Sequence, residues 1–252
     1  MSFIREIFKF KNNFFRIFFL KTKIKKILDH NYTIYFNKKK NSELSKLANL
    51  CKTNKGYILG EKSFEDLNIK RCYSYADFYS DIFSLSKNHI SKVFELGIGS
   101  VDPKQRDNML DQGANYESGG SLRMWKAYFK NAKIYGADID KKCLFSEERI
   151  KTFYVDQGNK DSINLMWKSI IETDFDIIID DGCHRFEETI VFFENSVDKM
   201  HDNGIYIIED ILVSQRKKFL NYFKNTNFNF KFVNFYRPDV NHTNNALLII
   251  AK

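Results

Sequence analysis

Short apolar runs alternate with longer amphipathic segments over most of the chain. The runs have the length of buried strands, and the segments between them carry apolar residues at helical spacing. Predicted strands lie at 92–96, 134–137, 153–155, 175–179, 205–210, 228–236 and 246–250. Predicted helices lie at 42–52, 73–86, 119–130, 161–171, 186–200 and 214–224. Alternation of this kind predicts an α/β domain built on a mostly parallel sheet.

The first 40 residues have a different pattern, in which phenylalanine and isoleucine at helical spacing are interleaved with lysine and arginine. Glu6 and Asp29 are the only acids in this stretch, which therefore predicts a basic amphipathic helix. We divide the chain into a basic, aromatic, helical N-terminal extension, residues 1–70, and an α/β domain, residues 71–252. Packing of the extension on the domain or on a second subunit is the interpretation we favour. Peripheral contact with an anionic membrane is the alternative.

Composition narrows the class of protein. Lys+Arg 40 against Asp+Glu 32 give a net charge of +8, which favours an anionic partner such as a phosphorylated small molecule, a nucleic acid or a membrane surface. The 4 cysteines show no CxxC and no ligand-like spacing, so neither a zinc site nor a disulfide framework is indicated. No apolar run reaches the roughly 18 residues that span a bilayer, and the N-terminus lacks a signal-peptide pattern. These features predict a cytoplasmic protein, with peripheral attachment at the inner membrane surface as an option.

Acidic residues follow two of the predicted strands. In FDIIIDDGCH, residues 175–184, the apolar run is followed by Asp180 and Asp181. IYIIED, residues 205–210, ends on Glu209 and Asp210 about one βαβ unit later. Neighbouring parallel strands would bring these carboxylates to the same edge of the sheet, where a hard cation such as Mg²⁺ would relieve their repulsion. The alternative is a purely structural role for Asp181, as the cap of the following helix. The repeated pattern favours the metal site, and His184 beside it could accept a proton.

The first predicted strand leads into a glycine turn, ELGIG, residues 95–99, which allows a ligand to approach the backbone. Asp138 follows the second strand and is placed to accept hydrogen bonds from ribose hydroxyls. Residues 100–118 are polar and predict a binding loop or lid. Tyrosines of the helix predicted at 73–86 belong to an aromatic stripe that is usually core, although its place before the first strand would let one or two close over a ligand.

Four segments together resemble class I S-adenosylmethionine (SAM) methyltransferases, and more narrowly the metal-dependent sugar O-methyltransferases of macrolide and bacterial polysaccharide biosynthesis. These segments are residues 95–99, GGSLRMWKAYFKNAKIYGADID at 119–140, FDIIIDDGCH at 175–184, and IYIIED at 205–210. The resemblance implies a Rossmann-like domain with a seven-stranded, mostly parallel sheet flanked by helices. It assigns to SAM the residues Tyr75, Glu95, Gly97, Ser121, Asp138, Asp156 and Gln157. It assigns Mg²⁺ to Asp181, Glu209 and Asp210, and the role of general base to His184.

The function predicted from this resemblance is Mg²⁺-dependent transfer of a methyl group from SAM to a sugar hydroxyl, in polysaccharide or other glycoconjugate biosynthesis such as that of a capsule. The expected partner is a small sugar substrate, with nucleotide linkage and homo-oligomerisation left open. Methylation of a catechol-like diol or of a phosphorylated molecule is an alternative in the same fold. A non-enzymatic RNA-binding or membrane scaffold would use the basic N-terminus but would not need acids at adjacent strand ends. A dinucleotide oxidoreductase is disfavoured because Asp102 stands where the third glycine of that fingerprint belongs.

Overall fold

The computed structural model describes residues 32–34, 42–56, 58–59, 62–63, 75–105, 108–110, 116–235 and 246–252. Residues 32–34 form a short strand, β1 (Tyr32–Ile34), rather than part of the predicted N-terminal helix. The rest of that helix, with its expected contacts to a membrane or a second subunit, lies outside the described residues.

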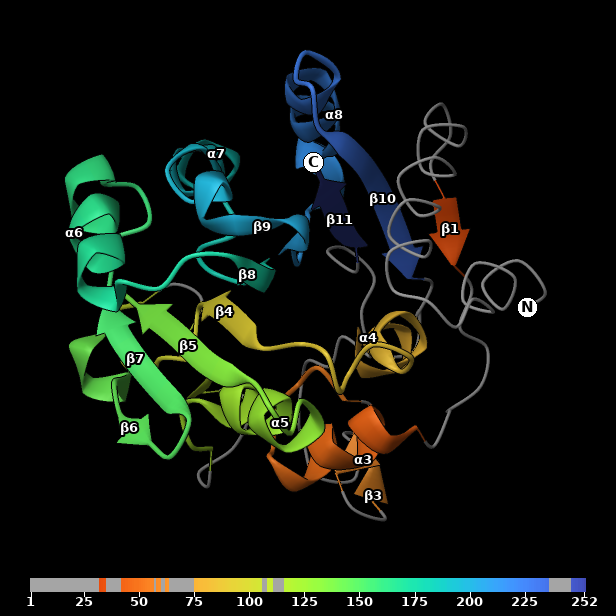
Figure 1. The fold of residues 1–252 in the computed structure, drawn as a ribbon, viewed down its shortest axis with the longest axis vertical. Coiled ribbons are helices and arrows are strands. Elements are labelled where there is room, and N and C mark those ends of the chain that lie inside the picture. Colours follow the sequence, from red (N-terminus) through yellow and green to blue (C-terminus); the bar gives the residue numbers. More distant parts are fainter. Residues whose placement is uncertain are drawn as a thin grey trace.

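Within the described residues, one nine-stranded sheet organises the fold (Figure 1). Its strand order is β1-β10-β11-β9-β8-β4-β5-β7-β6. Besides β1, these strands are β4 (Lys92–Leu96), β5 (Lys133–Asp138), β6 (Ser146–Glu147), β7 (Ile150–Tyr154), β8 (Phe175–Asp180), β9 (Met200–Ile208), β10 (Asn229–Phe235) and β11 (Ala246–Ala251). The strands from β7 through β5, β4 and β8 to β9 are parallel, whereas β11 is antiparallel to both of its neighbours. A separate hairpin pairs β2 (Ile58–Leu59) with β3 (Lys62–Ser63).

Helices cover both faces of the sheet. One hydrophobic core contains side chains of α3 (Glu43–Leu50), α4 (Tyr75–Phe83) and α5 (Gly120–Tyr128). The other contains side chains of α6 (Lys160–Ile170), α7 (Phe186–Glu194) and α8 (Arg216–Lys224). Short 3₁₀ turns lie at Lys141–Cys143, Val197–Lys199 and Val213–Gln215.

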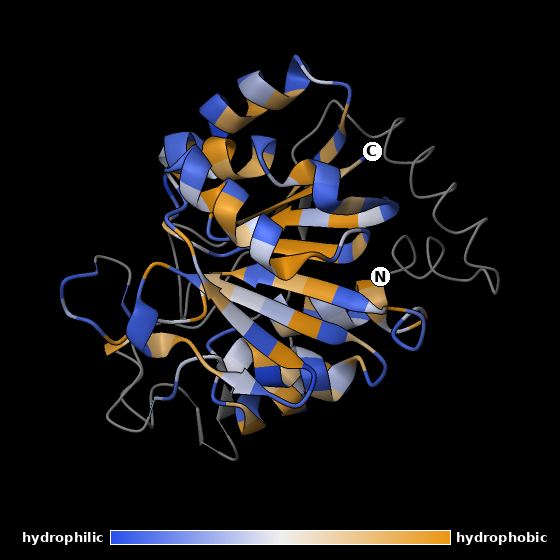
Figure 2. Ribbon diagram, turned by 60° about the vertical axis from the view of Figure 1, so that its left-hand side comes forward, coloured by the Kyte–Doolittle hydropathy of each residue, from blue (hydrophilic) through white to orange (hydrophobic). Residues whose placement is uncertain are grey.

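Alternation along the central strands divides side chains between the two cores. Val93 and Ile177 belong to the first core, while their neighbours Phe94 and Ile178 belong to the second, because successive side chains of a strand point to opposite faces. The strands are accordingly apolar in the middle of the molecule, and the polar positions of the helices face outward (Figure 2). Each fully buried side chain of this size contributes about 1.5–3 kcal/mol to the free energy of unfolding. Burial on both faces explains why the strands read as continuous apolar runs.

The α/β class and the mostly parallel sheet are confirmed, and each of the seven predicted strands is present. Two short edge strands, β1 and β6, bring the described sheet to nine rather than seven. The third predicted strand lies earlier than expected, at Ile150–Tyr154, because Ile150 and Thr152 pair with β5. The strand predicted at 205–210 ends at Ile208, so its two acids stand in the turn beyond the sheet.

Residues 42–56 pack against the sheet domain. Leu44 and Ala48 of α3 are fully buried in the first core, and the backbone carbonyl of Lys55 accepts a hydrogen bond from the N–H of Ala76 at the start of α4. Residues 64–74 lie outside the described residues, and the division of the chain at residue 70 stays a prediction. Among the residues that the structure describes, there is no helix with the length and apolar character needed to cross a membrane.

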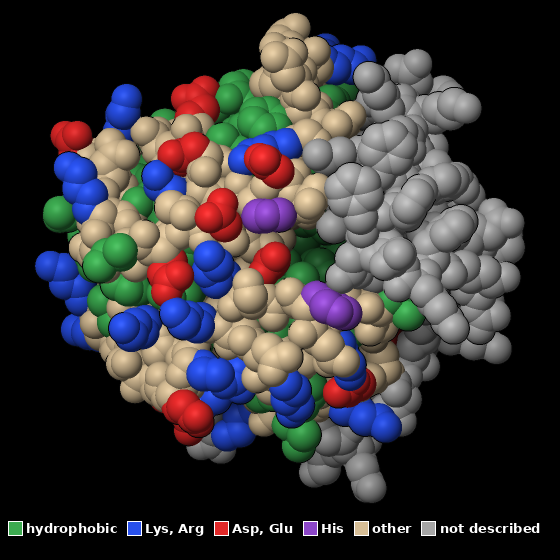
Figure 3. All heavy atoms as spheres, in the orientation of Figure 1, with side chains coloured by type: hydrophobic (Ala, Val, Ile, Leu, Met, Phe, Trp, Pro, Cys, Tyr) green, Lys and Arg blue, Asp and Glu red, His purple; other side chains and the backbone are tan. Residues whose placement is uncertain are grey.

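Charged side chains of both signs are spread over the surface seen in Figure 3, with lysine and arginine most frequent on its lower half, over α5 and the edge of the sheet at β6 and β7. The acids considered below are largely buried and make little contribution to this surface.

Candidate active site

Four carboxylates meet at the carboxyl ends of three adjacent strands. Glu95 is near the end of β4, Asp181 directly follows β8, and Glu209 and Asp210 directly follow β9. Backbone hydrogen bonds continue past the strands: the N–H of Asp181 donates to the carbonyl of Leu96, and that of Glu209 donates to the carbonyl of Asp180. These hydrogen bonds keep the carboxyl ends of the three strands side by side at one edge of the sheet, as the sequence predicted.

A buried lysine lies among these acids. The Nζ atom of Lys55 is 2.7 Å from Oδ2 of Asp181, 2.6 Å from Oε2 of Glu209 and 3.5 Å from Oε1 of Glu95. Burial lowers the pKa of Lys55, but the three acids raise it well above its ordinary value, so the side chain is an ammonium ion. The sequence interpretation missed this residue because it is carried by the segment assigned to the N-terminal extension.

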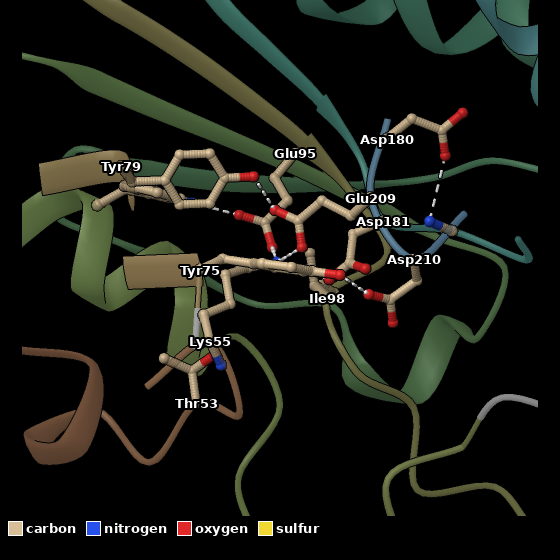
Figure 4. Close-up of polar contacts among 12 residues, drawn as sticks. Thr53, Lys55, Tyr75, Tyr79, Glu95, Ile98, Asp180, Asp181, Glu209 and Asp210 are labelled. Atoms are coloured by element: carbon tan, nitrogen blue, oxygen red, sulfur yellow. Dashed lines mark hydrogen bonds and ion pairs between the residues drawn. The ribbon is translucent and has the colours of Figure 1, made fainter. Parts of the chain in front are cut away.

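Two tyrosines of α4 hold the acid pair that follows β9 (Figure 4). The hydroxyl of Tyr75 donates to Oδ1 of Asp210 at 2.6 Å, and the hydroxyl of Tyr79 donates to Oε1 of Glu209 at 2.5 Å. Their spacing of four residues puts both on one face of the helix, which explains why a stripe expected to be core also reaches the site. Tyr75 directs its hydroxyl at Asp210, and its predicted role at the cofactor stays a prediction. Tyr79 was not singled out from the sequence.

Three side chains are placed to hold a metal ion: ligand atoms of Asp181, His184 and Asp210 lie within 4.8 Å of one another. The Nε2 atom of His184 is 3.9 Å from Oδ2 of Asp210. His184 and Asp210 both have positive φ, 53° and 54°, a conformation that costs side-chain-bearing residues about 1–3 kcal/mol and is concentrated at functional sites. Mg²⁺ commonly binds proteins through one or two carboxylates and retains water ligands, so Asp181 and Asp210 fit it while His184 remains available for a proton.

Glu209 differs from the other two predicted ligands. Both of its carboxylate oxygens already accept a hydrogen bond, one from Lys55 and one from Tyr79, and its side chain is 1% exposed. Its predicted role as a metal ligand stays a prediction. Burial and the neighbouring acids raise the pKa of Glu209 well above its ordinary value, and the contact with Lys55 opposes that shift.

A pocket of about 240 Å³ opens at the same edge of the sheet. Gly97 forms part of its wall with φ of +83°, and a Cβ atom there would lie 2.0 Å from the carbonyl oxygen of Asp181. Gly99 likewise has φ of +89°, and its missing side chain leaves room for the hydroxyl of Tyr116. Glycine is therefore required at position 97 by the backbone of Asp181 and at position 99 by the side chain of Tyr116, and both positions have positive φ.

Asp138 lies in the wall of this pocket at the end of β5. Its Oδ2 accepts the N–H of Ile98 and its Oδ1 accepts the N–H of Asp140, both at 2.9 Å. Burial raises its pKa, although these N–H donors oppose the shift. A carboxylate oxygen can accept a second hydrogen bond, so the anchored side chain can still meet a ribose hydroxyl.

Asp156 and Gln157 also line the pocket, but the amide of Gln157 is engaged within the protein. Its Nε2 donates to both carboxylate oxygens of Asp180 at 2.9 Å, and its Oε1 accepts the N–H of Cys183 at 2.8 Å. Burial raises the pKa of Asp180 to about 7, with the N–H of Gly182 opposing. Gln157 thus braces the turn that carries Asp181 and His184, and only its remaining surface faces the pocket.

The other two residues assigned to SAM occupy different positions. Ser121, in the first turn of α5, lines the pocket as expected for a helix N-terminus that meets a carboxylate. Glu95 is fully buried behind the pocket, where its Oε2 accepts a hydrogen bond from the indole Nε1 of Trp125. Tyr116, at the end of the predicted lid, lines the pocket and was missed because the polar loop gave no reason to single it out.

No protein-family profile matches the chain, but individual proteins do. It is 32% identical over 142 residues to an 8-demethyl-8-alpha-L-rhamnosyl tetracenomycin-C 2'-O-methyltransferase of Streptomyces olivaceus, which covers 56% of this chain and 34% of that protein. It is 33% identical over 133 residues to a demethylmacrocin O-methyltransferase of Streptomyces fradiae, covering 53% of this chain and 30% of that protein. The chain spans about a third of the length of these curated relatives.

Solved structures agree with the sequence matches. The MycE methyltransferase of the mycinamycin biosynthetic pathway, in complex with Mg, S-adenosylhomocysteine (SAH) and mycinamycin VI, superposes with a TM-score of 0.50 and 26% identity over 68% of this chain and 40% of that one. A second crystal structure, with Mg and SAH, gives a TM-score of 0.52 and 27% identity over 72% of this chain and 43% of that one. The chain therefore has the class I methyltransferase fold and is a relative of the sugar O-methyltransferases of macrolide and polyketide biosynthesis.

Proposed function

We propose that this chain transfers a methyl group from SAM to a hydroxyl of a sugar, with Mg²⁺ as its resident cation. One observation carries the proposal: a single pocket is lined both by the glycine turn with Asp138 and by the acids with His184. The first set suits a nucleoside-containing donor, and the second suits an ionising hydroxyl. A methyl donor and an acceptor bound there would be neighbours, which a group transfer requires.

The residues divide the chemistry between them. His184 accepts the hydroxyl proton at Nε2 as the acceptor oxygen forms its bond to the methyl carbon and the bond from that carbon to sulfur breaks. The products are a methyl ether and SAH, and the proton remains on the imidazole until solvent removes it. A divalent ion held by Asp181 and Asp210 would lower the pKa of the acceptor hydroxyl. Tyr75 keeps Asp210 oriented toward His184 through its 2.6 Å hydrogen bond.

The names of the relatives support a sugar as the acceptor. One is named as a 2'-O-methyltransferase of an alpha-L-rhamnosyl tetracenomycin, and another is named as a demethylmacrocin O-methyltransferase. We propose a sugar hydroxyl for this chain, carried on a glycoconjugate, a polysaccharide unit or a nucleotide-linked sugar. A catechol-like diol is the alternative acceptor because it would also present adjacent hydroxyls to the acids.

Methyl-labelled SAM and a panel of acceptors test this function. The panel contains methyl rhamnoside, rhamnosyl polyketides, nucleotide-linked deoxysugars and a catechol, each incubated with Mg²⁺ and again with excess EDTA. We expect label in a sugar methyl ether, lost in EDTA and restored by Mg²⁺. Label in the catechol alone would move the chain to diol methylation, and label transfer that persists in EDTA would contradict the metal assignment.

Replacing the predicted ribose acceptor should weaken donor binding. We expect Asp138→Ala to reduce SAM affinity by roughly 1.5–3 kcal/mol, the usual value of a hydrogen bond to a charged group. Titration calorimetry with SAH measures the change. Asp176→Ala is the matched control, because Asp176 also accepts backbone N–H groups, from Ser91 and Lys92, at the opposite end of the sheet. Equal SAH affinities in the two folded variants would place the ribose elsewhere.

A further inference from the structure

Arg216, the first residue of α8, is a half-buried arginine that faces no acid within the described part of the chain. Its Nε atom is buried and has no hydrogen-bond partner. Burial lowers the pKa of Arg216, and the group that opposes this shift is Tyr75 rather than a carboxylate. A charge withdrawn from water normally has a partner, because the loss of hydration must be offset. The described residues supply no such counter-charge.

The start of α8 is electrostatically unusual as well. Its first three residues are Arg216, Lys217 and Lys218, no acid lies in its first turn, and Gln215 at the N-cap forms no side-chain cap. The N-terminus of a helix is the positive end of its dipole, so cations are unfavourable there and anions are favoured. Lys218 pairs with Glu187 at 2.6 Å, and Lys217 is exposed to solvent. Of these three cations, Arg216 is therefore the one whose charge neither a described acid nor full exposure relieves.

Arg216 lies next to the acids that follow β9. The hydroxyl of Tyr75, the group that opposes the lowering of its pKa, donates to Oδ1 of Asp210 at 2.6 Å. Asp210 also lines the pocket of about 240 Å³ that contains the residues proposed for the donor, whereas Arg216 lies outside that pocket. The arginine thus stands beyond Asp210, as seen from the donor.

The packing of α8 brings the same residue close to the start of α7. Phe219 follows Arg216 by three positions and shares its helix face. The ring of Phe219 contacts that of Phe186, with centroids 4.9 Å apart, and Phe186 is two residues after His184. Arg216 is therefore on the side of the site where both the predicted base and Asp210 are found.

The strand order separates this position from the donor. The residues proposed for SAM lie at the ends of β4, β5 and β7, and the order β9-β8-β4-β5-β7 puts the acids of the site between them and α8. In methyl transfer the acceptor oxygen attacks from the side opposite the leaving sulfur, so the rest of the acceptor extends away from the donor. That direction leads to the connection between β9 and α8, where Val213 is 59% exposed and offers an apolar surface to a sugar ring.

We propose that Arg216 binds an anionic group of the acceptor, so that the sugar methylated by this chain carries an oxyanion, either a phosphate at its linkage or a carboxylate on its ring. The inference rests on the proposed function for the existence of a sugar acceptor, and it adds the charge of that sugar. A planar guanidinium suits both oxyanions because it can donate two parallel hydrogen bonds to them. Anchorage at Arg216 would hold the acceptor while its hydroxyl meets His184, as a group transfer requires.

Titration calorimetry with charged and neutral sugars, in the presence of SAH and EDTA, tests this role. EDTA ensures that a phosphate does not bind through a metal ion. Rhamnose 1-phosphate is compared with methyl rhamnoside, and methyl glucuronoside with methyl glucoside. We expect the wild-type chain to bind one of the charged sugars about tenfold or more tightly than its neutral counterpart. Preference for the phosphate identifies a phosphate-linked acceptor, and preference for the carboxylate identifies a uronic acid.

Variants of the helix start connect the preference to one side chain. Arg216→Gln should reduce it to less than about twofold, and Arg216→Lys should keep part of it, because lysine keeps the charge but not the planar fork. Lys217→Gln is the matched control: it removes an exposed cation from the same turn and should leave the preference within about twofold of wild type. Arg216→Gln should also melt within about 3 °C of wild type or higher, because an unpaired charge in a half-buried position does not stabilise the fold.

Equal affinities for charged and neutral sugars in the wild type would overturn the inference while the proposed function stands. The same holds for an unchanged preference in Arg216→Gln, or an equal loss of preference in Lys217→Gln. An Arg216→Gln protein that is unfolded, or that melts more than about 3 °C below wild type, also overturns it, because the arginine would then serve the fold. Failure of the wild type to transfer labelled methyl to any of the four sugars with Mg²⁺ would contradict the proposed function, and the inference with it.

Discussion

Asp210→Asn is expected to reduce methyl transfer by about 10³-fold or more, while SAH affinity stays within about twofold of wild type. The amide keeps the shape of the side chain and its contact with Tyr75, but it removes one of the two carboxylates placed to hold the ion. Metal activation of a hydroxyl supplies several kcal/mol of transition-state stabilisation, and each 1.36 kcal/mol is a factor of ten in rate. Donor binding should survive because the residues proposed to contact SAM lie at the ends of β4, β5 and β7 and at the start of α5.

This comparison needs two measurements on the same preparation. One is the transfer of labelled methyl from SAM, and the other is SAH affinity by titration calorimetry. Asp202→Asn serves as the control because Asp202 is 87% exposed and pairs only with Lys252 among the described residues. Full activity of Asp210→Asn at saturating Mg²⁺ would remove Asp210 from the metal site. Parallel loss of SAH binding would mean that the variant damages the pocket as a whole.

His184→Ala should retain both SAH and Mn²⁺ binding and lose about 10²–10⁴-fold in turnover, the usual contribution of a positioned general base. The left-handed backbone conformation at this residue holds the imidazole near Asp210, at 3.9 Å, and its side chain remains 19% exposed, so a proton can leave to solvent. Turnover and Mn²⁺ affinity must be measured together, since the imidazole nitrogen is also within reach of the ion.

The matched control is His89→Ala, because His89 is exposed and lies in the connection between α4 and β4. A loss of Mn²⁺ affinity of about tenfold or more in His184→Ala would identify the histidine as a ligand. Turnover equal to that of wild type would leave the acceptor hydroxyl to ionise without a protein base.

The sequence predicted the sheet well because its strands are buried on both faces and are followed by acidic residues. Ile177, Ile178 and Ile179 read as one apolar run, and the first acids after each run mark where the strand ends. Parallel strands then require the ends to meet, so the proximity of Asp181 and Asp210 follows from topology alone. The pairing of β6 and β1 at the two edges carries no such signal, because two- and three-residue strands show no periodicity.

What could not be predicted is the direction of individual side chains. Gln157 also braces Asp180, and the carboxylate of Glu95 accepts a hydrogen bond from Trp125. Their predicted roles at SAM stay predictions. Lys55 was missed altogether, since a lone lysine in a polar segment is normally solvated. Its burial depends on the packing of α3 against α4 and α5, which no local pattern reveals.

The central claim is that the SAM pocket and the metal site are one site. The most direct measurement is the nuclear magnetic resonance line of ¹³C-methyl-labelled SAM bound to the wild-type chain, recorded with Mg²⁺ and then with Mn²⁺, without any acceptor. A paramagnetic ion held by Asp181 and Asp210 should broaden the methyl carbon line strongly, and the effect should disappear in EDTA and in Asp210→Asn. A line from bound SAM that is equally sharp in Mg²⁺ and Mn²⁺ would contradict the account.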